Sequence, residues 1–229
     1  MGIKLHQIDY NTSLDTPINE NWCTSGASEH GLFSWTPTSV GAGAGVGLFA
    51  PIDNKYMMVS RQITGTTATG RNTLILGGAI NWLCFGDRNF ILETIVKIPV
   101  LATVAQAFTT YIGFGDNSGA GDPVDGIYFF YSQVNANWII KNRSNNVETQ
   151  TITATVVNTN WVTLRIVIST TSSTFFINNV NVGNIATNFP TGIARATNPM
   201  LKIQSTNGTT SKELYNNAYY LTINGATVK

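Results

Sequence analysis

The sequence has few charged residues, and this scarcity limits what the protein can bind. Lys, Arg, Asp and Glu make up 11% of its 229 residues, and the formal net charge is +1, whereas soluble domains average about 25% charged residues. No basic stripe is present, so nucleic acid is not an expected partner. A surface built from Thr, Asn, Ser and Gly is weakly protected against association, so we expect the chain to work in an assembly, as a homo-oligomer.

Cysteine, histidine and long apolar runs are also scarce. Cys23 and Cys84 are the two cysteines, and the first residues show no signal-peptide pattern, so we expect synthesis in the cytosol and two free thiols. His6 and His30 are far apart in the sequence and no Cys-x-x-Cys occurs, so neither zinc nor another cofactor is expected. No stretch approaches the ~18 apolar residues of a membrane-spanning helix.

Short runs of β-branched and aromatic residues recur along most of the chain. Three of them are Phe90–Val100, Thr109–Phe114 and Gly126–Tyr131, and turn residues separate the last two. In the first run, Glu93 and Lys97 fall on one face, which predicts a strand with one core face and one partly covered face. With turn signals every ~8–12 residues and no amphipathic helix, the pattern predicts an all-β fold, a β-sandwich of two antiparallel sheets.

The second half of the chain carries three more specific signals. Asn178 and Asn179 lie between two strand patterns and tolerate positive φ, so they predict a tight hairpin turn. Val147–Thr155 alternates polar residues on both faces, which predicts an edge strand. Trp161 begins a strand pattern, and we expect it in the core.

The first 55 residues are predicted to form an irregular N-terminal extension, with the sandwich domain over residues 56–229. Thr36–Gly47 is rich in Pro and then in Gly, a composition typical of a linker, a binding loop or an arm. Two interpretations stay open: an arm that lies on a neighbouring subunit, or a strand and a long surface loop within the domain. Trp22, Phe33 and Trp35 are candidate interface residues, because aromatic side chains in a polar segment often anchor it to its own domain or to a neighbour.

Two groups of segments resemble known families. Val124–Tyr131, Trp161–Ser169 and the late strand near Tyr219 are similar to the jelly roll of concanavalin A-like lectins and glucanases. Gly65–Arg71 (GTTATGR), with the strands that follow it, resembles jelly-roll domains of bacteriophage virion proteins. The resemblance covers residues 57–229 and implies a jelly-roll β-sandwich located in the virion, with capsid or tail subunits as its partners.

The resemblance implies a non-enzymatic structural protein made in the host cytoplasm. It would be a capsid decoration (cement) protein or a tail component, acting through protein–protein contacts. The alternative is a carbohydrate-binding, receptor-recognition module of a tail fibre or spike, which binds a host-surface glycan. Hydrolases of this fold carry acids clustered on one strand, whereas Glu93 stands alone on its strand. Hydrolysis is therefore not expected, although a carboxylate pair contributed by distant strands stays open.

The candidate ligand site is an Asp-rich turn between two strands. Asp125, Gly126 and Tyr128 match the lectin resemblance, in which the matching Asp accepts hydrogen bonds from sugar hydroxyls. The other interpretation of this Asp is a turn residue whose side chain caps the strand. Asp116 and Asp122 offer hard oxygen ligands close in sequence and are candidates for Ca²⁺, with a solvated turn as the other interpretation.

Overall fold

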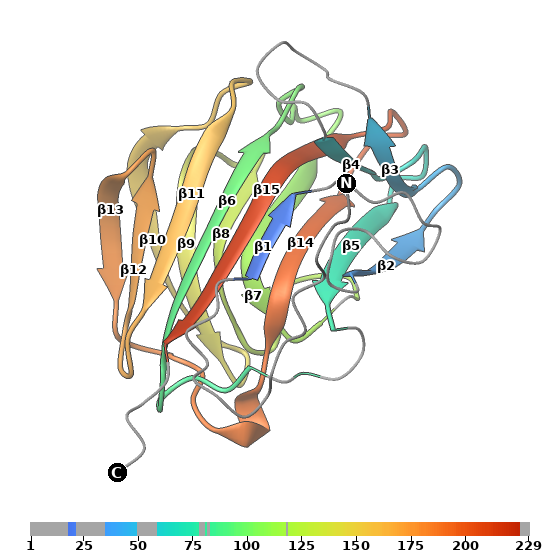
Figure 1. Ribbon diagram of the computed structural model, residues 1–229. Helices are drawn as coiled ribbons and strands as arrows, with labels where there is room; N and C mark the ends of the chain where they lie inside the picture. The colour runs from blue at the N-terminus through green and yellow to red at the C-terminus, as the bar shows by residue number, and fades with distance from the viewer. Residues whose placement is uncertain are drawn as a thin grey trace, which may run out of the picture.

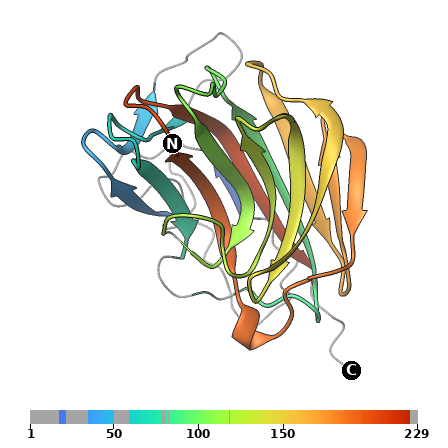
Figure 2. The ribbon, with the colours of Figure 1, turned by 180° about the vertical axis from the view of Figure 1, so that it is seen from behind.

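The computed structural model describes residues 18–21, 35–49, 59–77, 81, 83–117 and 119–224. These residues form two antiparallel sheets that pack face to face as a jelly-roll β-sandwich, which confirms the predicted fold class (Figure 1). Figure 2 shows the molecule from behind, with the second sheet toward the viewer. Within the described residues the helical structure is one turn of 3-10 helix, η1 (Ile193–Arg195).

The first sheet, sheet A, has eight strands. In spatial order they are β13 (Val180–Ile185), β12 (Ser173–Ile177), β11 (Val162–Ile168), β6 (Asn89–Lys97), β15 (Glu213–Asn224), β4 (Val59–Ile63) and β3 (Gly45–Phe49), and β1 (Ile18–Asn21) pairs with β15 beside this path. The second sheet, sheet B, has seven strands. They are β10 (Val147–Val156), β9 (Asn135–Ser144), β8 (Gly126–Ser132), β7 (Phe108–Gly115), β14 (Asn198–Ser205), β5 (Arg71–Leu76) and β2 (Trp35–Val40).

Alternation along the strands decides which side chains fill the space between the sheets. In β6, Leu92, Thr94 and Val96 are buried. Glu93 and Lys97 lie half-buried on the other face, as the sequence predicted. Each fully buried Leu, Ile, Val or Phe contributes about 1.5–3 kcal/mol to folding, so this shared interlayer core holds the two sheets together as one unit.

Sheet B is also covered on its outer face. The side chains that alternate with the interlayer core form a second apolar cluster, consisting of Ile75, Tyr111, Tyr128, Phe130, Ile139 and Met200. Burial on both faces explains why β8 reads as a continuous apolar run and not as an alternating one.

Three strands from the predicted N-terminal extension belong to the sandwich. β1 pairs with β15, β2 with β5 and β3 with β4. Trp35 on β2 is fully buried, and its ring packs edge-on against Tyr219 with the centroids 4.9 Å apart. Trp35 therefore anchors its segment to its own domain and has no exposed surface for a neighbouring subunit. Trp22 and Phe33 lie outside the described residues.

Hairpin turns follow the local sequence signals closely. Asn178 and Asn179 have φ values of 49° and 67°, which confirms the predicted tight turn. Asn145 and Asn146, with φ values of 54° and 65°, form the same kind of turn between β9 and β10. β10 lies at the edge of sheet B, as its polar pattern predicted.

Gly65 lets two turns pack against each other. Its φ is 70°, and a Cβ atom there would lie 2.1 Å from the carbonyl oxygen of Ala42 and 2.5 Å from the nitrogen of Ala44. The N–H of Thr66 donates to the same Ala42 oxygen at 2.9 Å. Glycine is thus required for the turn between β4 and β5 to hold the turn between β2 and β3.

Candidate functional site

Asp125 is tied to neighbouring turns. Its side chain is buried, and Oδ1 accepts a hydrogen bond from the backbone N–H of Asn145 at 2.8 Å. Oδ2 lies 3.4 Å from Nη1 of Arg195 in η1. Gly126 begins β8, and Tyr128 is fully buried on the outer face of sheet B. The three residues predicted to bind sugar therefore hold the fold together here, and their contact with a sugar stays a prediction.

Asp116 and Asp122, the candidate Ca²⁺ ligands, belong to separate hydrogen-bond networks. Oδ1 of Asp116 accepts from the N–H of Val124 at 2.9 Å, and burial raises the pKa of this carboxyl group. Asp122 faces the cations of β9 instead. No group of three or more His, Cys, Asp or Glu side chains that could hold a metal occurs in the described part of the chain.

The outer face of sheet B carries a charged network that the sequence reasoning missed. Nζ of Lys141 donates to Glu148 Oε2 at 3.1 Å and to Asp122 Oδ2 at 3.5 Å. Nη1 of Arg143 donates to the same two oxygens at 3.1 and 3.0 Å. The hydroxyl of Tyr111 donates to Asp122 Oδ1 at 2.8 Å. A local signal did exist, because residues two apart on a strand, such as Lys141 and Arg143, share a face.

Asp122 and Glu148 form the carboxylate pair that the sequence left open. Both bind the same nitrogen of Arg143, so their oxygens lie within about 6 Å, close to the spacing in retaining glycosidases. Burial opposes ionisation of Asp122, but Lys141, Tyr111 and Arg143 outweigh it and lower its pKa. With Lys141 and Arg143 the pair forms an ionic lock that fastens the Asp-rich turn to sheet B.

Lys202 lies beneath the same turn. It is fully buried on β14, and its Nζ donates to the carbonyl oxygen of Gly119 at 2.8 Å and also to that of Gly121. The ammonium group lies 4.5 Å from the centroid of the Tyr111 ring. Burial lowers the pKa of Lys202 to about 8.

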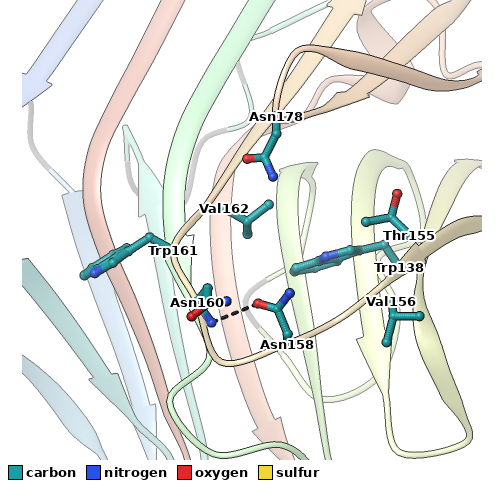
Figure 3. Close-up of a pocket in the computed structure, with 8 residues that line it drawn as sticks. All are labelled: Trp138, Thr155, Val156, Asn158, Asn160, Trp161, Val162 and Asn178. Atoms are coloured by element: carbon teal, nitrogen blue, oxygen red, sulfur yellow. Dashed lines mark hydrogen bonds between the residues drawn. The ribbon is translucent and has the colours of Figure 1, made fainter.

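A pocket of about 200 Å³ lies where the chain passes from sheet B to sheet A (Figure 3). This end pocket is lined by Trp138, Thr155, Val156, Asn158, Asn160, Trp161, Val162 and Asn178. All eight residues are uncharged. Trp138 is buried, and its ring packs edge-on against that of Phe129 with the ring centroids 6.1 Å apart. Val162 packs against the interlayer core. Trp138, which is 2% exposed, and half-buried Val162 therefore close the pocket on the side of the core.

Asn158 and Asn178 point their amide groups into the end pocket from opposite sides of Val162 (Figure 3). Oδ1 of Asn158 accepts from the N–H of Asn160 at 2.9 Å, and Oδ1 of Asn178 accepts from the N–H of Thr163 at 3.0 Å. Because the oxygens are used in this way, the Nδ2 groups are left to donate. Neither Nδ2 has a hydrogen-bond partner among the described residues.

Trp161 lies at the rim of the end pocket, so its prediction as a core residue was wrong. Its ring points away from Trp138 (Figure 3), and Nζ of Lys97 lies 5.7 Å from the ring centroid. The reason is strand alternation: Val162 faces the core, so the residue before it faces outward.

The sequence matches the family described as SO2946-like, C-terminal domain, over residues 55–227. The chain belongs to the SO2946-like family. No curated protein matches the sequence of this SO2946-like chain. None of the helical structure in the described residues is long and apolar enough to cross a membrane.

Solved structures similar to this SO2946-like chain share its fold at low sequence identity. SO2946 from Shewanella oneidensis MR-1, a protein of unknown function, has a TM-score of 0.66 and 14% identity, covering 95% of this chain and 91% of that one. The carbohydrate recognition domain of Emp47p has a TM-score of 0.58 and 11% identity, covering 93% and 96%. A Bacteroides ovatus GH16 protein in complex with a mixed-linkage glucan product has a TM-score of 0.58 and 12% identity, covering 90% and 99%. The fold is thus the concanavalin-like jelly roll of lectins and glucanases, and the bacteriophage part of the resemblance stays a prediction.

Proposed function

We propose that this SO2946-like chain is a non-enzymatic carbohydrate-binding module and that the end pocket is its sugar-binding site. The composition of the pocket carries the proposal. Half-buried Val162 and buried Trp138 line it on the side of the core, exposed Asn158 and Asn178 supply hydrogen-bond donors, and no lining residue is charged. Polar side chains that converge on a hollow and fix the orientation of a ligand are typical of a small-ligand site.

Fold analogy supports binding of a glycan, and the charged network supports the absence of catalysis. The fold is shared with the carbohydrate recognition domain of Emp47p, although a fold by itself does not assign a function. Asp122 and Glu148 are each paired with Lys141 and Arg143, so neither is free to deliver a proton to a glycosidic bond.

The test is a glycan array followed by titration of the best hits into ¹⁵N-labelled protein. Saturable shifts of the Trp138 indole N–H and of the Asn158 and Asn178 side-chain amides are expected. Asn178→Gly keeps the positive φ of the hairpin turn and removes the amide, so it should weaken binding. The matched control Asn146→Gly, in the other hairpin, should bind normally. Failure of every glycan to shift these signals, or normal binding by Asn178→Gly, would contradict the proposal.

A second candidate function is the structural role predicted from the sequence. The chain would be a homo-oligomeric capsid decoration or tail component of a bacteriophage virion, in contact with other capsid or tail subunits. Edge strand β10 favours it, because Val147, Ile152 and Val156 are 56%, 52% and 57% exposed there, and open strand edges pair readily with other chains. Light scattering should find an oligomer that Ile152→Lys converts to a monomer. A wild-type monomer at high concentration would argue against this role.

A further inference from the structure

We propose that the end pocket receives the acetamido group of an N-acetylated hexosamine, an inference that rests on the proposed function. The lining has three features that together suit this group: exposed amide donors, an apolar side chain at Val162 and no charge.

The donors of the pocket match a carbonyl oxygen. The Oδ1 atoms of Asn158 and Asn178 already accept backbone N–H groups at 2.9 and 3.0 Å, so the Nδ2 groups face the pocket without an acceptor beside them. A sugar hydroxyl has a proton to donate as well as lone pairs, whereas a carbonyl oxygen only accepts. An acetamido carbonyl would accept a hydrogen bond from either Nδ2 group.

The remaining groups of the lining suit the rest of the acetamido group. Its methyl group would lie against the side chain of Val162, which is apolar and half-buried. Thr155 and Asn160 carry polar atoms that accept hydrogen bonds, so they could receive the acetamido N–H and a ring hydroxyl. No lining residue is cationic, which leaves the carboxylate of an acidic sugar without a partner.

The size of the pocket limits the ligand to one sugar. Its volume of about 200 Å³ is smaller than the roughly 300 Å³ at the lower end of sites for drug-sized ligands. The pocket therefore recognises one substituted ring, and the rest of the glycan extends into solvent.

The experiment compares two disaccharides with the same β-1,4-linked backbone. ¹⁵N-labelled protein is titrated with N,N′-diacetylchitobiose and with cellobiose, which carries hydroxyls in place of the acetamido groups. Diacetylchitobiose should bind at least about tenfold more tightly, since its carbonyl accepts from the amide donors and its methyl group adds apolar contact. It should shift the signals of Trp138, Asn158 and Asn178.

Substitution of the two amides by carboxylates tests the donors directly. Asn158→Asp and Asn178→Asp keep the oxygen that accepts the backbone N–H and replace the NH₂ group with an oxygen, so each should weaken diacetylchitobiose binding about tenfold or more. Asn179→Asp makes the same change at the next position of the same hairpin turn, where the side chain does not line the pocket. This control should bind within about twofold of the wild type. An equal loss in Asn179→Asp would overturn the inference.

The outcomes separate the two proposals. Equal binding of both disaccharides would overturn the acetamido inference and leave the sugar-binding function standing. Binding of neither disaccharide, with no other glycan bound at the pocket, would overturn both. A further arm uses Nε-acetyl-lysine, which carries an acetamido group without a sugar ring. Binding of this compound as tightly as diacetylchitobiose would overturn the assignment to a hexosamine.

Discussion

Replacing Lys202 by Met should change how the stability of the protein depends on pH. The folded-state pKa of Lys202 is about 8 because the side chain is buried, whereas a lysine in an unfolded chain titrates near ~10.4. Between these two values the folded protein has lost a proton that the unfolded chain keeps. The unfolded state then binds more protons, so the free energy of unfolding contributed by Lys202 rises with pH.

The size of this change in unfolding free energy follows from the difference between the folded-state and unfolded-state pKa values of Lys202. Each pH unit between these two values contributes about 1.4 kcal/mol, so between pH 7 and pH 9 Lys202 adds roughly 1.3 kcal/mol to the free energy of unfolding. Met preserves most of the length of the side chain and has no ammonium group. Other titrating groups, including Lys212, whose pKa burial also lowers, are present in both proteins and cancel in the comparison.

The assay is equilibrium unfolding in urea at pH 7 and pH 9. The change in unfolding free energy from pH 7 to pH 9 should be more positive in the wild type than in Lys202→Met, by the amount given above. The control Lys97→Met removes a half-buried lysine from the outer face of sheet A and measures what the loss of a lysine elsewhere does to the pH response. Identical pH responses of the wild type and Lys202→Met would refute the reasoning.

Three further substitutions test the fold by urea unfolding. Gly65→Ala should cost about 3 kcal/mol, since the new methyl meets backbone atoms. Gly192→Ala, with a φ of 80° but open space around it, should cost about 1 kcal/mol, and equal costs would contradict the close approach of the turns. Asp122→Asn should lose about 2 kcal/mol at pH 7 through its hydrogen bonds to charged groups. Because the pKa of Asp122 is lowered, this loss should shrink below pH ~4, where the wild-type carboxylate becomes protonated. The control is Asp87→Asn, which changes an exposed carboxylate. A loss that does not depend on pH, or an equal loss in the control, would count against the ionic lock. Trp35→Ala should cost about 3–5 kcal/mol, and a cost below about 1 kcal/mol would mean that β2 does not share the core.

Features set by neighbours along the chain could be predicted from the sequence, and features set by distant contacts could not. The alternation in β6 and the Asn178–Asn179 turn were predicted because side-chain direction and positive φ are local properties. Trp35 lies in a Pro- and Gly-rich surrounding that suggested an arm, and pairing of β2 with β5 overrode that suggestion.

The candidate site depends almost entirely on long-range arrangement. Asn158 reads as an ordinary loop residue, and Asn178 as an ordinary turn residue. They face one pocket because the ends of β10 and β12 come together when the sheets stack. Asp122 likewise meets Lys141 only through the pairing of β8 with β9. No periodic pattern in the sequence predicts such long-range contacts.

The position of β15 affects how the protein can be made. This last strand runs between β4 and β6, and β6 is separated from it in sequence by more than a hundred residues. While a ribosome is still translating, sheet A is split at its centre, and both flanking strands present open backbone edges. Chains that stop short of residue 213, through premature termination or clipping, would keep those edges exposed and would tend to aggregate.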